Sequence, residues 1–252
     1  MFSIRKLFAR KEEWIYEDIG RELIVDIHSH LIPGIDDGAS SPEKSLELIR
    51  GLQRLGYESL IATPHVMAEG YRNSRERIIR EYEKILALLQ KEAVDISLSV
   101  AAEYYMDDGL EKLIEDGEIL TFGNRYILFE TSYFAQPYNF DNLVYLMRVN
   151  GYTPVMAHPE RYSYIDDFSL YYDEWREMGI LFQVNLNSLV AYYGPAPLER
   201  ARWLAERGMI DFLGSDLHNE EQLEALERGI WSVDIEKLLE KNPLKNHSLS
   251  PF

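Results

Sequence analysis

Residues 23–30 read Leu-Ile-Val-Asp-Ile-His-Ser-His, a short apolar run that ends in two histidines. Three later apolar runs also end at or just before a histidine, at His65, His158 and His218. Of the six histidines, only His247 stands apart, in a polar segment near the C-terminal end. Imidazoles gathered at strand ends, together with carboxylates, are what a multinuclear metal site requires.

The composition is that of one ordinary globular domain. The chain has 252 residues, of which 46% are hydrophobic and 27% are charged, and a single α/β barrel commonly has this length. The net charge of −17 argues against nucleic acid as the main partner, because phosphate backbones attract basic surfaces. A surplus of carboxylates on the surface favours solubility.

The chain contains no cysteine. A thiolate nucleophile and a thiolate zinc site are therefore excluded, and any metal must lie among nitrogen and oxygen ligands. The same absence is compatible with a reducing cytoplasm, where we expect the protein. No apolar stretch approaches the roughly 20 residues that span a bilayer, and the first residues lack the apolar core of a signal peptide. We expect residues 1–22 to form an N-terminal extension with at most peripheral membrane contact.

Short β-type runs alternate with longer amphipathic stretches. In one of these stretches, Ile78, Ile85 and Leu89 recur at helical spacing with charges between them. Strands are predicted at 23–30, 59–65, 97–104, 126–132, 153–158, 180–186 and 211–216. Helices are predicted near 42–55, 74–92, 107–116, 139–150, 167–178, 196–207 and 220–228.

Seven β–α units in series predict a parallel sheet with helical crossovers. We expect a closed or nearly closed barrel over residues 23–228, because the polar residues all arrive at the C-terminal strand ends. An open doubly wound sheet is the alternative, but it would more often carry a glycine-rich loop where this chain has His-Ser-His. Residues 229–252 are predicted to form a polar tail, packed on the barrel or trailing from it, with a helix around 234–241.

The ends of the predicted strands carry both histidines and carboxylates. His28 and His30 are two residues apart, so their side chains project from the same face of the first strand. In a barrel all of these ends converge on one mouth, which would give enough ligands for two or three divalent ions. One of Asp36 and Asp37 is expected at this site, while the other can cap the helix that begins near Pro42. The converging residues are His28, His30, Asp36, Asp37, His65, Glu103, Glu130, His158, Asp216 and His218.

Four motifs stand at these strand ends: Asp-Ile-His-Ser-His at 26–30, Thr-Pro-His at 63–65, Ala-His-Pro-Glu-Arg-Tyr at 157–162 and Gly-Ser-Asp-Leu-His at 214–218. They resemble the motifs of the polymerase and histidinol phosphatase (PHP) family. The start His-Ser-His-x-x-Pro-Gly-x-Asp-Asp-Gly and Gly-Tyr-Arg-Asn at 70–73 resemble the bacterial metal-dependent protein-tyrosine phosphatases of capsule and exopolysaccharide loci. The resemblance spans about residues 23–219. It implies a distorted (β/α)7 barrel, the PHP fold, with three divalent metals, often manganese; iron, zinc and magnesium are alternatives.

The resemblance also implies roles for individual residues. Arg161 matches the arginine that the family uses on the substrate phosphate. Members often carry another arginine just after the Asp-x-His motif, where this chain has Asn219-Glu220-Glu221, and Arg72 is the candidate substitute. The implied ligand sets are His28, His30, Glu103 and Asp216 for one metal, Asp37, His65 and His218 for a second, and Glu103, Glu130 and His158 for a third, with Glu103 bridging.

The implied reaction is hydrolysis of phosphotyrosine on a protein, with a bacterial tyrosine kinase as the expected partner. A bound divalent ion lowers the pKa of water toward ~7, so the reaction needs no thiolate. Glu160 or a water at the metals would serve as general acid. Loop aromatics could form a rim for the phosphotyrosyl ring: Tyr71, Tyr133, Phe134, Tyr138 and Tyr162.

Two other functions compete with this prediction. A phosphatase of small metabolites such as histidinol phosphate would use the same ligands. A non-catalytic metal-binding module that regulates a kinase by docking belongs to a different class, but such a module has no need of nine ligands. A nuclease-like role is disfavoured by the net charge, and the sequence leaves the oligomeric state open.

Overall fold

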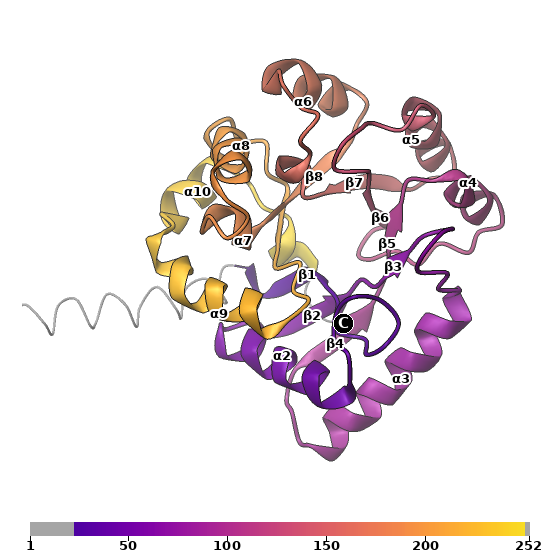
Figure 1. Ribbon diagram of the computed structural model, residues 1–252, viewed down its shortest axis with the longest axis vertical. Coiled ribbons are helices and arrows are strands. Elements are labelled where there is room, and N and C mark those ends of the chain that lie inside the picture. The colour runs from indigo at the N-terminus through magenta and orange to yellow at the C-terminus, as the bar shows by residue number, and fades with distance from the viewer. Residues whose placement is uncertain (1–22, 250–252) are drawn as a thin grey trace, which may run out of the picture.

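The computed structural model describes residues 23–249 and shows an α/β protein in which helices surround a set of parallel strands (Figure 1). The predicted N-terminal extension, 1–22, lies outside the described residues. The strands are β1 (Val25–Ser29), β2 (Ser59–Ala62), β3 (His65–Val66), β4 (Ser97–Val100), β5 (Glu103–Tyr105), β6 (Tyr126–Glu130), β7 (Thr153–Ala157), β8 (Leu181–Asn185) and β9 (Phe212–Gly214).

Every predicted helix is present, with ends that agree to within one or two residues. The larger helices are α2 (Pro42–Arg54), α3 (Arg75–Lys91), α4 (Asp108–Glu115), α5 (Phe140–Val149), α6 (Phe168–Glu177), α8 (Pro195–Glu206), α9 (Glu220–Gly229) and α10 (Ile235–Lys241). Short elements that the sequence did not predict are α7 (Leu186–Leu189) and the 3-10 turns η1 (Pro159–Arg161), η2 (Ile230–Ser232) and η3 (Asn246–Leu249).

Local sequence explains where these helices begin. Ser41 caps α2, because its side chain accepts a hydrogen bond from the amide of Lys44, and Pro42 occupies the first turn. Ser74 caps α3 in the same way through the amide of Arg77. The apolar faces of these helices are buried against the strands, as for Ile49 and Ile85.

The parallel strands form two sheets, with orders β1-β2-β4 and β3-β5-β6-β7-β8-β9. The second and third predicted strands are each interrupted, which divides them into β2 and β3 and into β4 and β5. Pairing keeps the same offset across the break, since Ser59 lies opposite Ser97 and His65 lies opposite Glu103. Pro64 lies in the first interruption and has no amide proton to donate to a ladder.

A single closed barrel is not found among residues 23–249. β5 pairs with β6, but no pairing joins β4 to β6 within this part of the chain. A cavity of about 630 Å³ lies at this gap, and the hydroxyl side chains of Ser97 and Ser99 help to line it. On the other side, β1 approaches the end of β9, where the amide of Asp216 donates to the carbonyl of His28 at 2.8 Å.

The segment after α9 packs against the bottom of the strands. Asn246 is fully buried, and its side-chain amide donates to the carbonyls of Val25, at 3.0 Å, and Leu213, at 2.7 Å. Its side-chain oxygen accepts from the amide of Leu213 at 3.0 Å. One asparagine therefore joins β1 to β9 and holds the described end of the chain.

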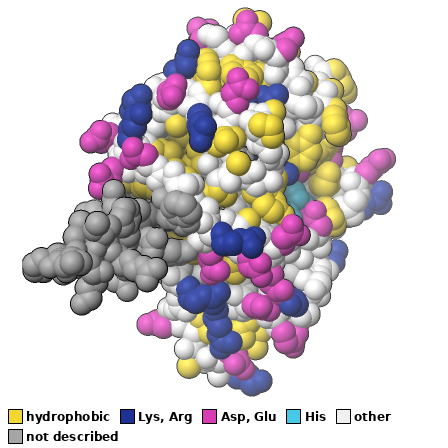
Figure 2. Space-filling view, turned by 60° about the vertical axis from the view of Figure 1, so that its left-hand side comes forward, with side chains coloured by type: hydrophobic (Ala, Val, Ile, Leu, Met, Phe, Trp, Pro, Cys, Tyr) yellow, Lys and Arg dark blue, Asp and Glu magenta, His cyan; other side chains and the backbone are white. Residues whose placement is uncertain are grey.

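The surface mixes charges of both signs. On the face shown in Figure 2, basic side chains are interspersed with acidic ones, and hydrophobic side chains gather in the upper half of the view. No helix among the described residues is long and apolar enough to cross a membrane.

Candidate metal centre

Histidines and carboxylates from the C-terminal ends of the strands gather at one place. Three groups of side chains each bring their ligand atoms within 4.8 Å of one another. The first group is His28, His30, Glu103 and Asp216; the second is His30, Asp37, His65 and His218; the third is His65, Glu103 and Glu130. The first of these groups has the same members as one predicted ligand set.

In the first group, both histidines direct Nε2 toward two carboxylates. His28 Nε2 lies 3.1 Å from Glu103 Oε2 and 3.3 Å from Asp216 Oδ1. His30 Nε2 lies 3.3 Å and 3.4 Å from the same two oxygens. All four side chains are almost completely buried. Four donors converging in this way form a compact N/O cage.

The second group lies closer to solvent. Asp37 Oδ1 is 3.5 Å from Nε2 of His65 and 3.5 Å from Nε2 of His218. The ring of His30 stacks on that of His218, with centroids 3.9 Å apart. His30 therefore lies next to the ligand set Asp37, His65 and His218, in which the sequence analysis did not include it. Asp37 is half-exposed, so this group forms the open side of the centre.

The third group is built around Glu103 and Glu130. His65 Nδ1 lies 3.1 Å from Glu103 Oε2 and 3.3 Å from Glu130 Oε1. His158, the histidine predicted here, directs Nε2 to Glu103 Oε1 at 3.1 Å and lies 3.7 Å from Glu130 Oε2. Glu103 thus contacts the histidines of two groups at once, as expected for a bridging carboxylate.

Buried atoms without partners show that this donor set fits cations. His65 Nδ1 and Glu103 Oε2 have no hydrogen-bond partner although both atoms are buried, and their 3.1 Å approach is not a hydrogen bond. Leaving such atoms unsatisfied is costly. Divalent cations coordinated by imidazole nitrogens and carboxylate oxygens would satisfy them, since N/O sites suit manganese, iron, zinc or magnesium.

Electrostatic interactions within the cluster shift the pKa values of its two glutamates in opposite directions. Burial acts to raise the pKa of Glu103, but the charge of His28 and the hydrogen bond from His158 outweigh it and hold this pKa well below its usual range. For Glu130, burial and the nearby charge of Glu103 both act in the same direction and hold the pKa well above its usual range. Burial lowers the pKa of His65 to about 4, so its ring is neutral and able to bind a metal at neutral pH.

A second layer of polar side chains orients the histidines. Gln183 Oε1 lies 2.7 Å from Nδ1 of His28, and Asp36 Oδ2 lies 2.9 Å from Nδ1 of His30, which leaves Nε2 of each ring for the centre. Asn185 accepts from Gln183 and donates to Asp216 Oδ2 at 2.7 Å. Asp36 therefore supports a histidine, and it does not cap α2.

Gln183 and Asn185 were not identified from the sequence as residues of the site. They alternate with Phe182 and Val184 along β8, so both face the same side of a strand that is otherwise apolar. Polar residues at that period in a buried strand are the signal that could have identified them.

The backbone at the centre adopts conformations that non-glycine residues rarely take. His158 has φ +34° and Asp216 has φ +51°, both in the left-handed region. Two glycines allow close approach: a Cβ on Gly38 would lie 2.2 Å from the carbonyl oxygen of His30, and one on Gly214 would lie 2.8 Å from Cβ of His28. The last glycine of the Pro-Gly-Ile-Asp-Asp-Gly motif and the glycine of the Gly-Ser-Asp motif thus have a steric reason.

A cavity of about 480 Å³ opens over this cluster, a size suited to a small ligand. The side chain of Arg161 is only 21% exposed, and its Nη1 donates to Asp216 Oδ2 at 2.8 Å. Tyr71 lines the cavity and stacks on His65, with ring centroids 5.5 Å apart. Tyr133 lies deeper, whereas Phe134 is 82% exposed at the rim.

Four of the residues predicted for catalysis or substrate contact do not line this cavity. Glu160 is fully buried, and its Oε1 accepts from the amide of Asn185 and the hydroxyl of Ser188. Tyr162 is also fully buried and donates to the carbonyl of Ala157. Arg72 donates to the carbonyl of Ala68 at 2.7 Å and lies outside the lining. Tyr138 is 92% exposed and likewise lies outside it.

These positions correct the predicted roles. Burial in the core prevents Glu160 and Tyr162 from touching a substrate. The sequence does not reveal this burial, because both residues lie within four positions after His158. Burial also raises the pKa of Glu160 to about 7, although its own hydrogen bonds act in the opposite direction. Arg72 bonds to Ala68 and lies outside the cavity lining, so its position gives no support to the prediction that it replaces the arginine absent after His218.

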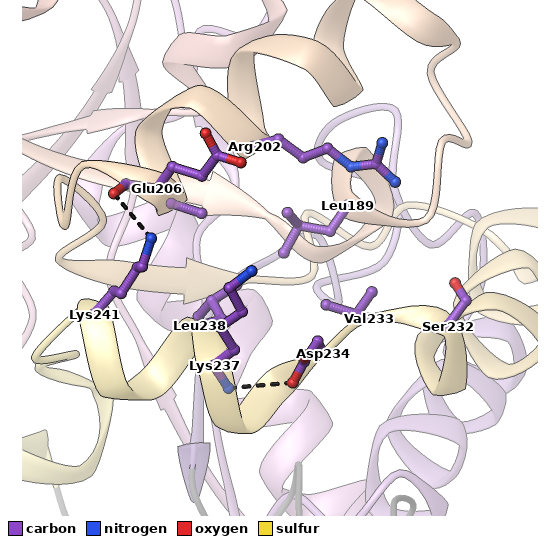
Figure 3. Close-up of a pocket in the computed structure, with 10 residues that line it drawn as sticks. Leu189, Arg202, Glu206, Ser232, Val233, Asp234, Lys237, Leu238 and Lys241 are labelled. Atoms are coloured by element: carbon purple, nitrogen blue, oxygen red, sulfur yellow. Dashed lines mark hydrogen bonds between the residues drawn. The ribbon is translucent and has the colours of Figure 1, made fainter.

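A third cavity, of about 250 Å³, lies between α8 and α10 (Figure 3). Its charged side chains include Arg202, Glu206 and Lys241, which are all exposed, and Nζ of Lys241 donates to the carbonyl of Glu206. None of the predicted site residues lines it. Its charged side chains are of both signs and exposed to solvent, so the His/carboxylate cluster is the stronger candidate for the functional site.

The fold and the site define a class: an α/β protein of parallel strands with a candidate multinuclear centre of imidazoles and carboxylates beside one arginine. The profile of the family described as "Capsular polysaccharide synthesis, CpsB/CapC" matches residues 24–229. The chain belongs to this family.

Named relatives cover most of the chain. It is 31% identical to the tyrosine-protein phosphatase YwqE of Bacillus subtilis (strain 168) over 198 residues, which are 78% of each chain. It is 32% identical to the tyrosine-protein phosphatase CpsB of Streptococcus pneumoniae over 207 residues, 78% of this chain and 83% of the relative. A solved structure from work on YwqE and CpsB, described as unique metal-dependent tyrosine phosphatases, matches with a TM-score of 0.74 at 28% identity, covering 86% of this chain and 95% of the other.

Proposed function

We propose that this chain is a metal-dependent phosphomonoesterase that hydrolyses phosphotyrosine on a protein, with a bacterial tyrosine kinase of capsule or exopolysaccharide synthesis as its substrate. The observation that carries the proposal is the convergence of five histidines and four carboxylates beneath a cavity that also holds Arg161. The naming of YwqE and CpsB as tyrosine phosphatases supports the choice of phosphotyrosine.

The ligand sets predicted from the sequence remain part of this proposal. We propose three divalent ions, with manganese as the preferred metal and Glu103 shared between two of them. Bound ions would supply Lewis-acid stabilisation of the phosphoryl oxygens and would activate water near neutral pH. Gln183 and Asp36 fix the rings of His28 and His30, so the ligands need little reorganisation when substrate binds.

The remaining side chains provide binding and orientation. Arg161 offers a planar fork of donors to a phosphoryl oxygen. Tyr71, Tyr133 and Phe134 give the cavity an aromatic wall on which a phosphotyrosyl ring can pack. Because tyrosinate is a fairly good leaving group, the buried position of Glu160 is no obstacle to the reaction.

The arrangement of the strands supports a single active-site mouth. We propose that the two sheets form the wall of one distorted (β/α)7 barrel, interrupted where β4 and β6 separate. The shared register of the broken strands and the contact between β1 and the end of β9 favour this description. It explains why residues as distant in sequence as His28 and Asp216 lie side by side.

The alternative function is a phosphatase of small metabolites such as histidinol phosphate. The two are distinguished by measuring kcat/KM for a phosphotyrosyl peptide and for histidinol phosphate on one preparation loaded with Mn²⁺. We expect the peptide to be preferred by at least about tenfold. A preference for histidinol phosphate would reject the proposed substrate and keep the metal chemistry.

A further inference from the structure

The guanidinium group of Arg161 lies between two tyrosine rings. Its Cζ is 4.1 Å from the ring centroid of Tyr193 and 4.8 Å from that of Tyr133. Among the described residues, its only hydrogen bond is the one from Nη1 to Asp216. Arg161 is also the only cationic residue, other than histidine, among the described residues that line the cavity.

Both tyrosines are fixed by the loops that build the site. Tyr193 lies between α7 and α8, and its hydroxyl accepts from Nε2 of Gln222 at 3.2 Å. Gln222 in turn accepts from the amide of His218 at 2.6 Å, so the ring is tied to a predicted metal ligand. The carbonyl of Tyr133 accepts from the amide and the hydroxyl of Ser163, at 2.8 Å and 2.7 Å.

The two tyrosine rings hold the planar guanidinium group of Arg161 in one orientation. A cation over an aromatic face is attracted by the ring, more strongly where the pair is shielded from water. A free arginine side chain loses rotamer entropy when it engages an anion. Two rings that hold the guanidinium before substrate arrives remove much of that cost and leave its edge, with the remaining N–H donors, as the part that a ligand can reach.

We propose that Tyr193 and Tyr133 are positioning residues, which clamp Arg161 so that its N–H edge meets the phosphoryl group. The proposal rests on the proposed function, because it assigns the clamp to that same phosphate site. Tyr193 is the principal wall, since it is closer to the guanidinium and is anchored to Gln222. Neither tyrosine touches the reacting atoms in this account: both act on the phosphoryl group through Arg161, and Tyr133 also belongs to the aromatic wall of the cavity.

The first test compares two substitutions of Tyr193. Tyr193→Leu removes the aromatic face and is expected to lower kcat/KM on a phosphotyrosyl peptide about tenfold, with bound metal near that of wild type. Tyr193→Phe keeps the face, loses only the bond to Gln222, and is expected to stay within about threefold of wild type. Tyr145→Leu, an exposed tyrosine on α5, is the control for the side-chain change. Equal losses in the Phe and Leu variants would overturn the role of the aromatic face.

The second test uses free guanidinium ion to replace the missing side chain. Arg161→Ala leaves the slot between the rings empty, and added guanidinium is expected to restore part of the lost kcat. In Arg161→Ala/Tyr193→Leu the slot has lost one wall, and rescue is expected to need at least about tenfold more guanidinium. Equal rescue of the two proteins would overturn the clamp.

A binding measurement separates failure of the clamp from failure of the proposed function. Calorimetry of metal-loaded protein with inorganic phosphate requires no turnover. We expect Tyr193→Leu to weaken phosphate binding when Arg161 is present and to have no further effect in Arg161→Ala. Equal effects in both backgrounds would reject the clamp. Absence of activity on phosphotyrosyl peptide in wild type, with this pattern intact, would reject only the proposed substrate.

Discussion

Glu103 is the residue on which the cluster depends most. It lies within 3.3 Å of four histidine side chains and belongs to two of the three ligand groups. We predict that Glu103→Ala lowers the metal content, measured by mass spectrometry, by more than one ion per chain, because two ions would share this carboxylate. The exposed Glu111→Ala on α4 serves as the control. A Glu103→Ala protein with a full complement of metal would remove Glu103 from the centre.

Arg161→Lys tests the phosphate contact directly. Lysine keeps the positive charge but has no planar fork, so the variant is expected to fold and to retain its metals. Loss of one transition-state donor is typically worth ~3 kcal/mol, or about a hundredfold in kcat. The measurement is kcat and KM on a phosphotyrosyl peptide, beside metal content and a melting curve. Near wild-type kcat would assign Arg161 a structural role.

At the residue scale, the sequence could predict the side chains that bear the chemistry but not those that support them. The histidines stand out because each ends an apolar run. For Gln183 and Asn185, the only indication in the sequence is that they are polar positions in a buried strand. No sequence pattern marks Tyr193, because its contact with Arg161 exists only after α7 and α8 fold. Glu160 was predicted to be the general acid because it lies near His158 in the sequence. Its burial in the core shows that nearness in sequence does not place a side chain in the cavity.

At the level of elements, periodicity predicted the helices well because their apolar residues recur at helical spacing and most of the larger helices begin at a side-chain cap; α5 and α8 have no such cap hydrogen bond. The broken strands were harder. β3 is only two residues long. Within the described residues β2 pairs with both β1 and β4, whereas β3 pairs with β5 alone, and this difference lies in the tertiary pairing and not in the local sequence. The four-residue α7 is too short to show a helical period.

Asn246 offers a test of how the last described segment is attached. Its three backbone hydrogen bonds to β1 and β9 are all buried. We predict that Asn246→Ala lowers the free energy of unfolding by about 2 kcal/mol, because the backbone groups lose partners in the core. Denaturant unfolding measures this, with the exposed His247→Ala as the control. Equal stability of the two variants would show that the segment is not anchored through this side chain.

For the whole molecule, metal binding and folding should be coupled. The ligands of the cluster come from strands that lie between Val25 and Gly214 in the sequence and from the loops after them, so they come together only in the folded protein. Ions bound at the cluster therefore stabilise the native state and not the unfolded chain. Free Mn²⁺ at a hundred times its dissociation constant should add about 2.7 kcal/mol, which for a chain of this size is about 5–10 °C in Tm. Calorimetric melting with and without chelator checks this. An unchanged Tm would mean that the described fold does not depend on these ions.

The central claim is that this chain without cysteine hydrolyses phosphotyrosine by means of ions held at the His/carboxylate cluster. The most direct measurement is phosphate release from a phosphotyrosyl peptide by metal-free protein as Mn²⁺ is added back, with bound ions counted per chain. The account predicts no activity without metal, a rise to full activity as the cluster fills, and indifference to thiol-blocking reagents. Full activity in metal-free protein would contradict it.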